Sequence, residues 1–286
     1  MINMRRSIIS FGLAALVALI WPATALAATL VPLGTAGNYA VLAATAITAS
    51  GPGSWITGQM GISPGALAAI TGFPPSTSGH IDAANPAAVQ AKSDLTTAFT
   101  QAAGQTPCTP VGPALDGLTL VAGIYCAGTM GLTGTLTLNG SGVYIFQIAS
   151  TLITAAARVT LINGAQPCDI FWVVGSSATI GAGATFVGNI MALTDINMFS
   201  GATLNGRALA RNGQVTLITN RIIQPSGCGF AAPAYVPPPF GTTLPATLGV
   251  PWELIGQIPW LLVIGVGAGL GLTALGLSAR RRRRSV

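Results

Sequence analysis

Leu136-Thr137-Leu138 is the first of five apolar–Thr–apolar triplets that decide the fold class. The others follow at threonine intervals of 23, 25, 18 and 13 residues: Val159-Thr160-Leu161, Ala184-Thr185-Phe186, Ala202-Thr203-Leu204 and Val215-Thr216-Leu217. In a β-strand, alternation turns the apolar neighbours inward and the threonine outward. Repeated short units that cannot bury a face alone predict a mainly β, stacked solenoid, and their uneven spacing predicts imperfect coils. A β-sandwich, in which alternating threonine is also common, is the competing interpretation.

One segment has helical periodicity instead. Asn85 is a favourable N-cap, Pro86 suits the first helical position, and Gly104 closes the segment. Apolar residues recur between them at helical spacing: Ala87, Ala88, Ala91, Leu95, Ala98, Phe99 and Ala102. The polar side carries Gln90, Lys92, Asp94 and Gln101. We expect one long helix along a flank of the solenoid, and upstream strands at 40–47 and 55–62 in the same stack.

Residues 1–28 have the pattern of a signal peptide. Arg5 and Arg6 precede an apolar run, and Ala25-Leu26-Ala27 is a suitable cleavage site. An uncleaved N-terminal membrane anchor is the alternative.

The C-terminal end predicts a membrane anchor at 252–279. Its uncharged part, from 260 to 279, is as long as a helix that crosses the hydrocarbon core. The five arginines of the tail, 280–286, are expected to stay in the cytoplasm by the positive-inside rule, and they argue against a cleaved glycolipid-anchor signal. The folded domain would then lie outside the cell, at its surface. Leu244-Pro245-Ala246-Thr247-Leu248 weakly resembles a sortase signal, with Leu248 in place of glycine, so cell-wall attachment is the alternative.

The middle of the chain divides into a domain at 29–229 and a proline-rich spacer at 230–251. The net charge of +6 arises at the two ends, because five basic and five acidic side chains balance within the domain. Nucleic-acid binding requires a basic face on the folded domain, so the composition gives no support for it.

All four cysteines lie in the domain: Cys108, Cys126, Cys168 and Cys228. An even count in an exported chain predicts two disulfides, and three pairings are possible. We favour Cys108–Cys126, a short local loop, which leaves Cys168–Cys228. A zinc site of four thiolates is the rival interpretation, although no two cysteines have CxxC spacing.

The sequence from Leu30 to Ile223 resembles the microbial ice-binding protein family. The resemblance is carried by seven stretches: Leu33-Gly34-Thr35-Ala36-Gly37-Asn38-Tyr39-Ala40-Val41-Leu42-Ala43, Gly61-Ile62-Ser63-Pro64-Gly65, Thr71-Gly72-Phe73-Pro74-Pro75, Ala91-Lys92-Ser93-Asp94-Leu95, Val143-Tyr144-Ile145-Phe146-Gln147-Ile148, Phe171-Trp172-Val173-Val174-Gly175-Ser176-Ser177-Ala178-Thr179, and Asn205-Gly206-Arg207-Ala208-Leu209-Ala210-Arg211-Asn212-Gly213. It implies a discontinuous right-handed β-solenoid with a long helix alongside, and ice as the binding partner.

Two outward ladders are candidates for the ice-binding face. Aligning the coils on their triplet threonines places Thr154, Thr179 and Asn197 in one column, with Ala156, Gly181 and Phe199 two residues on, and turns Ile153 inward. We favour this surface because it mixes threonine with small residues. The rival ladder is formed by the triplet threonines: Thr137, Thr160, Thr185, Thr203 and Thr216.

An enzyme is not expected. The domain has five aspartates, no glutamate, and no two acids close together in sequence, so the paired carboxylates of a glycosidase are missing. His80, the single histidine, could pair with Asp82, but we interpret it as a hydrogen-bonded residue before the helix. No metal or cofactor is expected. The alternative function is that of a surface adhesin for another substrate, such as a polysaccharide.

Overall fold

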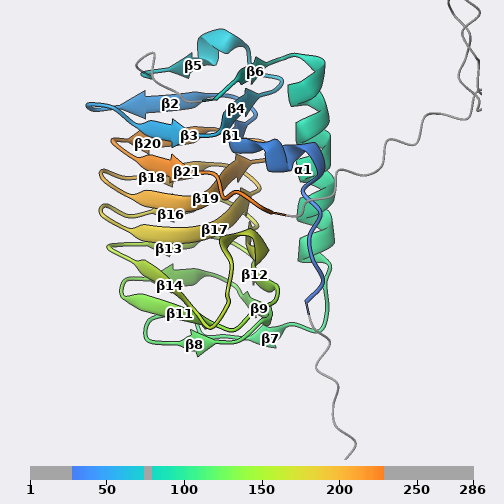
Figure 1. The fold of residues 1–286 in the computed structure, drawn as a ribbon, viewed down its shortest axis with the longest axis vertical. Helices are drawn as coiled ribbons and strands as arrows, with labels where there is room; N and C mark the ends of the chain where they lie inside the picture. Colours follow the sequence, from blue (N-terminus) through green and yellow to red (C-terminus); the bar gives the residue numbers. More distant parts are fainter. Residues whose placement is uncertain (1–27, 74–78, 229–286) are drawn as a thin grey trace, which may run out of the picture. The chain divides into compact units, whose positions relative to one another are not determined.

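The computed structural model describes residues 28–73 and 79–228. It is a stack of parallel β-strands with one long helix, α1, running along its side (Figure 1). The coils contribute short strands to three faces, and every strand pairing is parallel. The predicted solenoid is confirmed and the sandwich is wrong.

The first face is the seven-stranded sheet, whose outward side we call the threonine face. Its strands, in spatial order, are β10 (Met130–Leu132), β13 (Leu152–Thr154), β16 (Ala178–Ile180), β18 (Ile196–Met198), β20 (Val215–Ile218), β2 (Ile47–Ser50) and β5 (Ile70–Thr71).

The other two faces belong to one fourteen-stranded sheet. The covered face lies under α1 and consists of β6 (Ile81–Ala83), β4 (Gln59–Ile62), β1 (Tyr39–Ala43), the second halves of β19 (Thr203–Ala210) and β17 (Thr185–Ala192), β15 (Ile170–Val174), β12 (Tyr144–Ile148), β9 (Gly123–Ala127) and β7 (Thr109–Pro110). The arginine face consists of β8 (Thr119–Leu120), β11 (Thr135–Asn139), β14 (Arg158–Ile162), the first halves of β17 and β19, β21 (Arg221–Ile223) and β3 (Trp55–Thr57). Three 3₁₀ turns complete the fold: Gly34–Asn38, Leu67–Ala69 and Pro167–Asp169.

The long strand β17 passes from the arginine face to the covered face at Gly188. This glycine has a φ of +111°, a conformation that costs glycine little. A Cβ there would lie 2.6 Å from Cγ2 of Ile170, so the bend needs a residue without a side chain.

The solenoid is discontinuous in sequence. The chain builds the coils of β1 to β6 first, crosses to the opposite end of the stack through α1, and then coils back from β7 to β21. The last coils meet the first, because Val41 of β1 pairs with Ala208 of β19 and Thr48 of β2 pairs with Thr216 of β20.

Two apolar cores hold the stack together. The inner core contains a ladder of aromatic rings from successive coils, in which Phe146 and Trp172 stack with centroids 4.0 Å apart. The outer core lies between the covered face and α1, where Ala91, Leu95 and Ala98 are fully buried. Burial on both sides explains why the fully buried strands β1 and β15 carry no charged or amide side chain.

Helix α1 spans Pro86–Ala103, and its predicted boundaries are confirmed. The Asn85 side chain accepts a hydrogen bond from the Ala88 amide at 2.9 Å, and Gly104 is the C-cap. Lys92, expected on the polar side, instead reaches inward, and its Nζ donates to the carbonyls of Ala210 and Arg211. Burial, together with the Arg211 charge, lowers the pKa of Lys92 to about 8.

Within the described ranges, none of the helices has the length and hydropathy of a membrane span. Residues 1–27 of the predicted signal peptide, the spacer at 230–251, the anchor at 252–279 and the tail at 280–286 lie outside those ranges.

Candidate functional site

The threonine face carries one continuous outward column. Register pairs join each member to the next across all seven strands: Thr71, Thr48, Thr216, Asn197, Thr179, Ile153 and Gly131. Their flanking residues point inward; Ala178 and Ile180, on either side of Thr179, are fully buried. Alternation along each strand therefore produces a single file of short side chains on the outside.

This column has the chemistry of a regular, uncharged surface. Strand spacing repeats its side chains every 4.8 Å or so, and β-branched threonine has few rotamers to lose. Thr48 and Thr216 are close enough for their hydroxyls to lie 3.5 Å apart. No charged side chain belongs to the seven strands. The column can therefore order water at fixed intervals without a strongly hydrated group to interrupt it.

The predicted position of Thr154 in this column is wrong by one residue. Ile153 pairs with Thr179 and is 57% exposed, whereas Thr154 is 5% exposed. The Thr154 hydroxyl accepts a hydrogen bond from the Gly181 amide at 3.0 Å. Thr154 therefore supports the corner of a neighbouring coil from inside.

Two offsets combine in this shift. Arg158, and not Thr160, is the register partner of Thr185, so alignment on the triplet threonines misplaces this coil by two residues. Three residues separate β13 from β14, whereas four separate β16 from β17, and this shorter corner reduces the shift to one residue. Ala156 and Gly181 consequently lie in these corners and form no second column; Gly181 is buried, and a Cβ there would lie 2.5 Å from the Ala155 carbonyl. Phe199, which follows β18, is 46% exposed.

The rival ladder is also divided by the structure. Thr137 pairs with Thr160, and Thr185 pairs with Thr203, but the two pairs stand in different columns because Arg158 is the partner of Thr185. Thr216 lies on the threonine face. The triplet threonines therefore do not form one surface.

The arginine face is less uniform. One of its outward columns reads Thr135, Arg158, Thr185, Thr203, Arg221 and Trp55. Arg158 and Arg221 are exposed, and Trp55 is 48% exposed. Large side chains thus flank the central threonines Thr185 and Thr203 on both sides.

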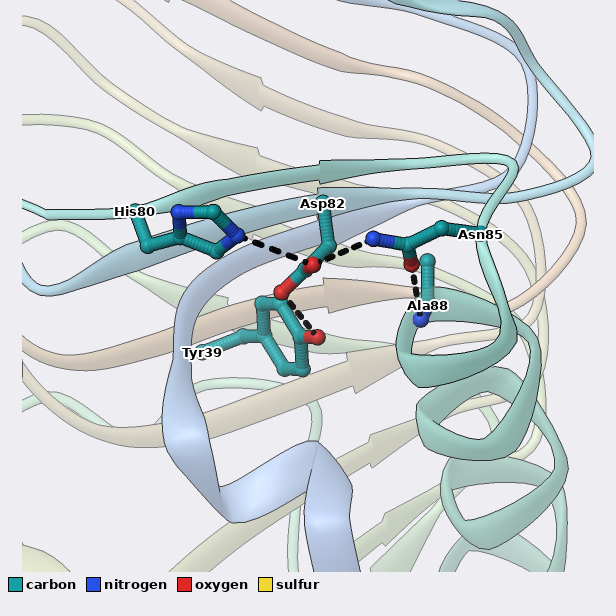
Figure 2. Close-up of polar contacts among 5 residues, drawn as sticks. All are labelled: Tyr39, His80, Asp82, Asn85 and Ala88. Carbon is teal, nitrogen blue, oxygen red and sulfur yellow. Dashed lines mark hydrogen bonds and ion pairs between the residues drawn. The ribbon is translucent and has the colours of Figure 1, made fainter.

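The His80–Asp82 pair lies just before α1 and beside its N-cap residue Asn85 (Figure 2). His80 Nε2 lies 3.2 Å from Asp82 Oδ1, but the imidazole is 71% exposed and the carboxylate is buried. The Tyr39 hydroxyl donates to Asp82 at 2.7 Å, and the Asn85 amide donates to it at 2.5 Å.

These contacts give Asp82 a structural role. Burial alone would raise the pKa of Asp82, but hydrogen bonds from Asn85 and Tyr39 and the charge of His80 outweigh it, and the pKa lies below the usual value. Burial, and then the hydrogen bond to Asp82, raise the pKa of Tyr39. Asp82 holds the N-cap residue Asn85 against strand β1, so the predicted role of His80 beside the helix start is confirmed.

Both favoured disulfides are confirmed. Cys108 is bonded to Cys126, and Cys168 is bonded to Cys228. All four thiols are thereby used, which excludes the zinc site. In the part of the chain that the structure describes, no three His, Cys, Asp or Glu side chains converge as metal ligands.

Sequence reasoning missed two threonines of the column, Thr48 and Thr71, and also Gly131. The signal was present, since Ile47-Thr48-Ala49 is itself an apolar–Thr–apolar triplet. It was overlooked because these strands lie far upstream of the other triplets and join them only through the discontinuity of the stack.

Comparison with known proteins agrees with this geometry. The family model described as ice-binding-like matches residues 41–223. An ice-binding protein from Nostoc sp. is 43% identical over 205 residues, which cover 68% of this chain and 75% of the relative. An ice-binding protein from Flavobacterium frigoris is 37% identical over 68% of this chain and 77% of the relative.

Solved structures agree as well. The crystal structure of an ice-binding protein from an Antarctic biological consortium matches with a TM-score of 0.67 at 38% identity, over 71% of this chain and 95% of that chain. That of an ice-binding protein from Antarctomyces psychrotrophicus matches with a TM-score of 0.64 at 37% identity, over 68% of this chain and 98% of that chain. The chain belongs to the ice-binding-like family.

Proposed function

We propose that the chain binds ice through the threonine face. The observation that carries this proposal is the outward column of short, uncharged side chains that stays in register across all seven strands. Of the residues favoured from the sequence, Thr179 and Asn197 remain at its centre. Thr48, Thr71 and Thr216 extend it, and Ile153 takes the place of Thr154.

The physical basis is a match between a rigid surface and ordered water. Parallel strands fix the side chains at regular intervals in one direction. Each threonine presents a methyl group that favours ordered neighbouring water and a hydroxyl that can anchor it. Because the backbone and χ1 are already fixed by the sheet, little conformational entropy remains to be lost on contact.

The test compares one tyrosine on each face. Thr179→Tyr places a ring above its neighbours and should abolish most ice affinity by lifting the ice plane from the whole column. Thr185→Tyr, its matched control on the arginine face, should retain ice affinity. Both side chains point outward, so the free energy of unfolding should change by about 0.5 kcal/mol or less. The melting temperatures should therefore change little. Partitioning into slowly grown ice and thermal hysteresis give the readout. Loss in Thr185→Tyr alone would move the site to the arginine face, and a parent without either activity would contradict ice binding.

The proposal includes display of this domain at the cell surface. The sequence patterns of residues 1–28 and 252–286 support export and retention by a C-terminal anchor. Protease added to intact cells should release a fragment that ends in the spacer at 230–251, and resistance until lysis would contradict the orientation. Detergent should extract the intact protein; if release needs wall-degrading enzymes, the Leu244–Leu248 segment is a sortase signal instead.

A further inference from the structure

The positively charged side chains of the folded domain fall into two groups. Of its five Lys and Arg side chains, three are engaged internally. Lys92 donates to two carbonyls, Arg207 is buried and donates to Asn189 and to the Gly37 carbonyl, and Arg211 lies 5.1 Å from the Phe99 ring centroid.

The other two, Arg158 and Arg221, are exposed and share one column of the arginine face. Two threonines, Thr185 and Thr203, stand between them in register. Three strand steps of about 4.8 Å place the two arginine positions about 14 Å apart. The spacing is fixed by the same parallel ladder that organises the threonine face.

The fold does not require arginine at these positions. Thr135, Thr185 and Thr203 occupy equivalent places in the same column, so a short side chain satisfies the strand equally well. No acidic residue occurs in any strand of this face. Neither arginine forms an ion pair with a residue that the structure describes. The two charges are therefore available to a ligand from outside.

The surroundings indicate the chemistry of that ligand. Guanidinium groups bind carboxylates in a bidentate manner. Trp55, half exposed and next in register after Arg221, provides an aromatic surface for the apolar face of a sugar ring. The threonine hydroxyls between the arginines, with exposed Asn205 beside them, can donate to and accept from sugar hydroxyls. Two cations are too few for a nucleic-acid footprint, which spans many phosphates.

We propose that the arginine face binds an extended anionic polysaccharide, of the polyuronate class, laid across the strands from Trp55 to Arg158. Its carboxylates contact the two arginines and a sugar ring packs on the tryptophan. This site is separate from the threonine face, so the domain can contact a hydrated polymer on one side and ice on another. Each exposed charge pair contributes little alone, and a repeating polymer gains affinity from several weak contacts together.

The test measures binding of the full-length chain to polyguluronate, neutral dextran and inorganic polyphosphate at low and high salt. The chain should bind polyguluronate, more weakly as salt rises, and should not bind dextran. Replacing both arginines by the residue already present between them, Arg158→Thr with Arg221→Thr, should weaken polyguluronate binding about tenfold. The corresponding glutamine pair checks that the loss follows the charge.

A matched control moves the charges elsewhere. Val89→Arg with Thr100→Arg, both exposed on α1, places two arginines about 16 Å apart on one side of the helix. Added to the threonine pair, these arginines should not restore binding. Trp55→Ala should weaken binding of polyguluronate while leaving any binding of polyphosphate unchanged.

The remaining outcomes would overturn the proposal. They are no binding by the parent, unchanged binding in both double variants, or restoration by the helix arginines, which would show a bulk charge effect. Equal affinity for polyphosphate with no effect of Trp55→Ala would identify a general anion surface and not a saccharide site. Ice partitioning, measured in parallel, should stay as in the parent for every variant.

Discussion

The threonine face and the arginine face are built on the same coils, yet they present different chemistry. Both alternate buried apolar residues with outward polar ones, and both repeat in parallel register. The outward column of the threonine face consists of short, uncharged side chains. That of the arginine face has Arg158, Arg221 and Trp55 in line with threonines. The solenoid thus determines spacing and burial, and the outward residues alone determine what each face can bind.

The largest expected effect comes from giving the threonine face a feature of the arginine face. Asn197→Arg places a strongly hydrated charge in the middle of the column, and removing its water to seat ice costs several kcal/mol. Ice affinity should fall by about a hundredfold or more. Asn205→Arg, on the arginine face, is the matched control and should leave ice affinity unchanged. Equal losses of ice affinity in the two variants, measured by ice partitioning, would show that the two faces do not differ in ice binding.

A smaller effect should separate inward from outward threonine. Thr154→Val removes the acceptor for the buried Gly181 amide and should cost about 1–3 kcal/mol of folding free energy. Thr160→Val, at an outward position of the arginine face, should cost about 0.5 kcal/mol or less. Denaturant unfolding gives both values. Ice affinity per folded molecule should be unchanged in Thr154→Val; its loss at unchanged stability would place Thr154 back on the binding surface.

The covered face should give the smallest effect at neutral pH and a distinct dependence on acid. The pKa of Asp82 is lowered in the folded state, so its contribution is complete above the ordinary aspartate pKa of about 4 and is lost as pH falls through the lowered value. Asp82→Asn should cost about 1–2 kcal/mol at neutral pH, because the charge-assisted hydrogen bonds from Tyr39 and Asn85 are weakened. The difference from the parent should shrink below pH 4 in unfolding experiments. A difference that does not change with pH would show that Asp82 is not ionised in the fold.

The sequence correctly predicted the elements that are determined by residues close together in the chain. The Asn85-Pro86 start and Gly104 end fixed α1, because N-cap, first-turn and C-cap preferences act over a few residues. The two disulfides followed from the short loop between Cys108 and Cys126. The triplets indicated strands and their inward side.

The predictions that were wrong or incomplete concern residues whose positions depend on contacts between distant segments of the chain. Whether Ile153 or Thr154 faces outward depends on the register between coils, in which Arg158 and not Thr160 pairs with Thr185, and on a corner that is one residue shorter than the next. No periodicity within a strand reports either of these. Lys92 lies on the polar side of a helical wheel, but its Nζ turns inward and donates to the carbonyls of Ala210 and Arg211 at the end of β19. Thr48 and Thr71 could be placed only once β2 was known to stack on β20.

The discontinuity of the stack has a consequence for how the chain acquires its structure. Strands β1, β2 and β3, near the N-terminus, have neighbours in β19, β20 and β21, the last strands of the solenoid. Pairings between residues so distant in sequence give a high contact order, and loop closure over such lengths slows folding. During synthesis the first coils therefore keep one edge unpaired until residues 203–223 have been made. A chain truncated before β19 should lack the second neighbour for its first coils. Completion of the solenoid is therefore a late event that requires the full length of the domain.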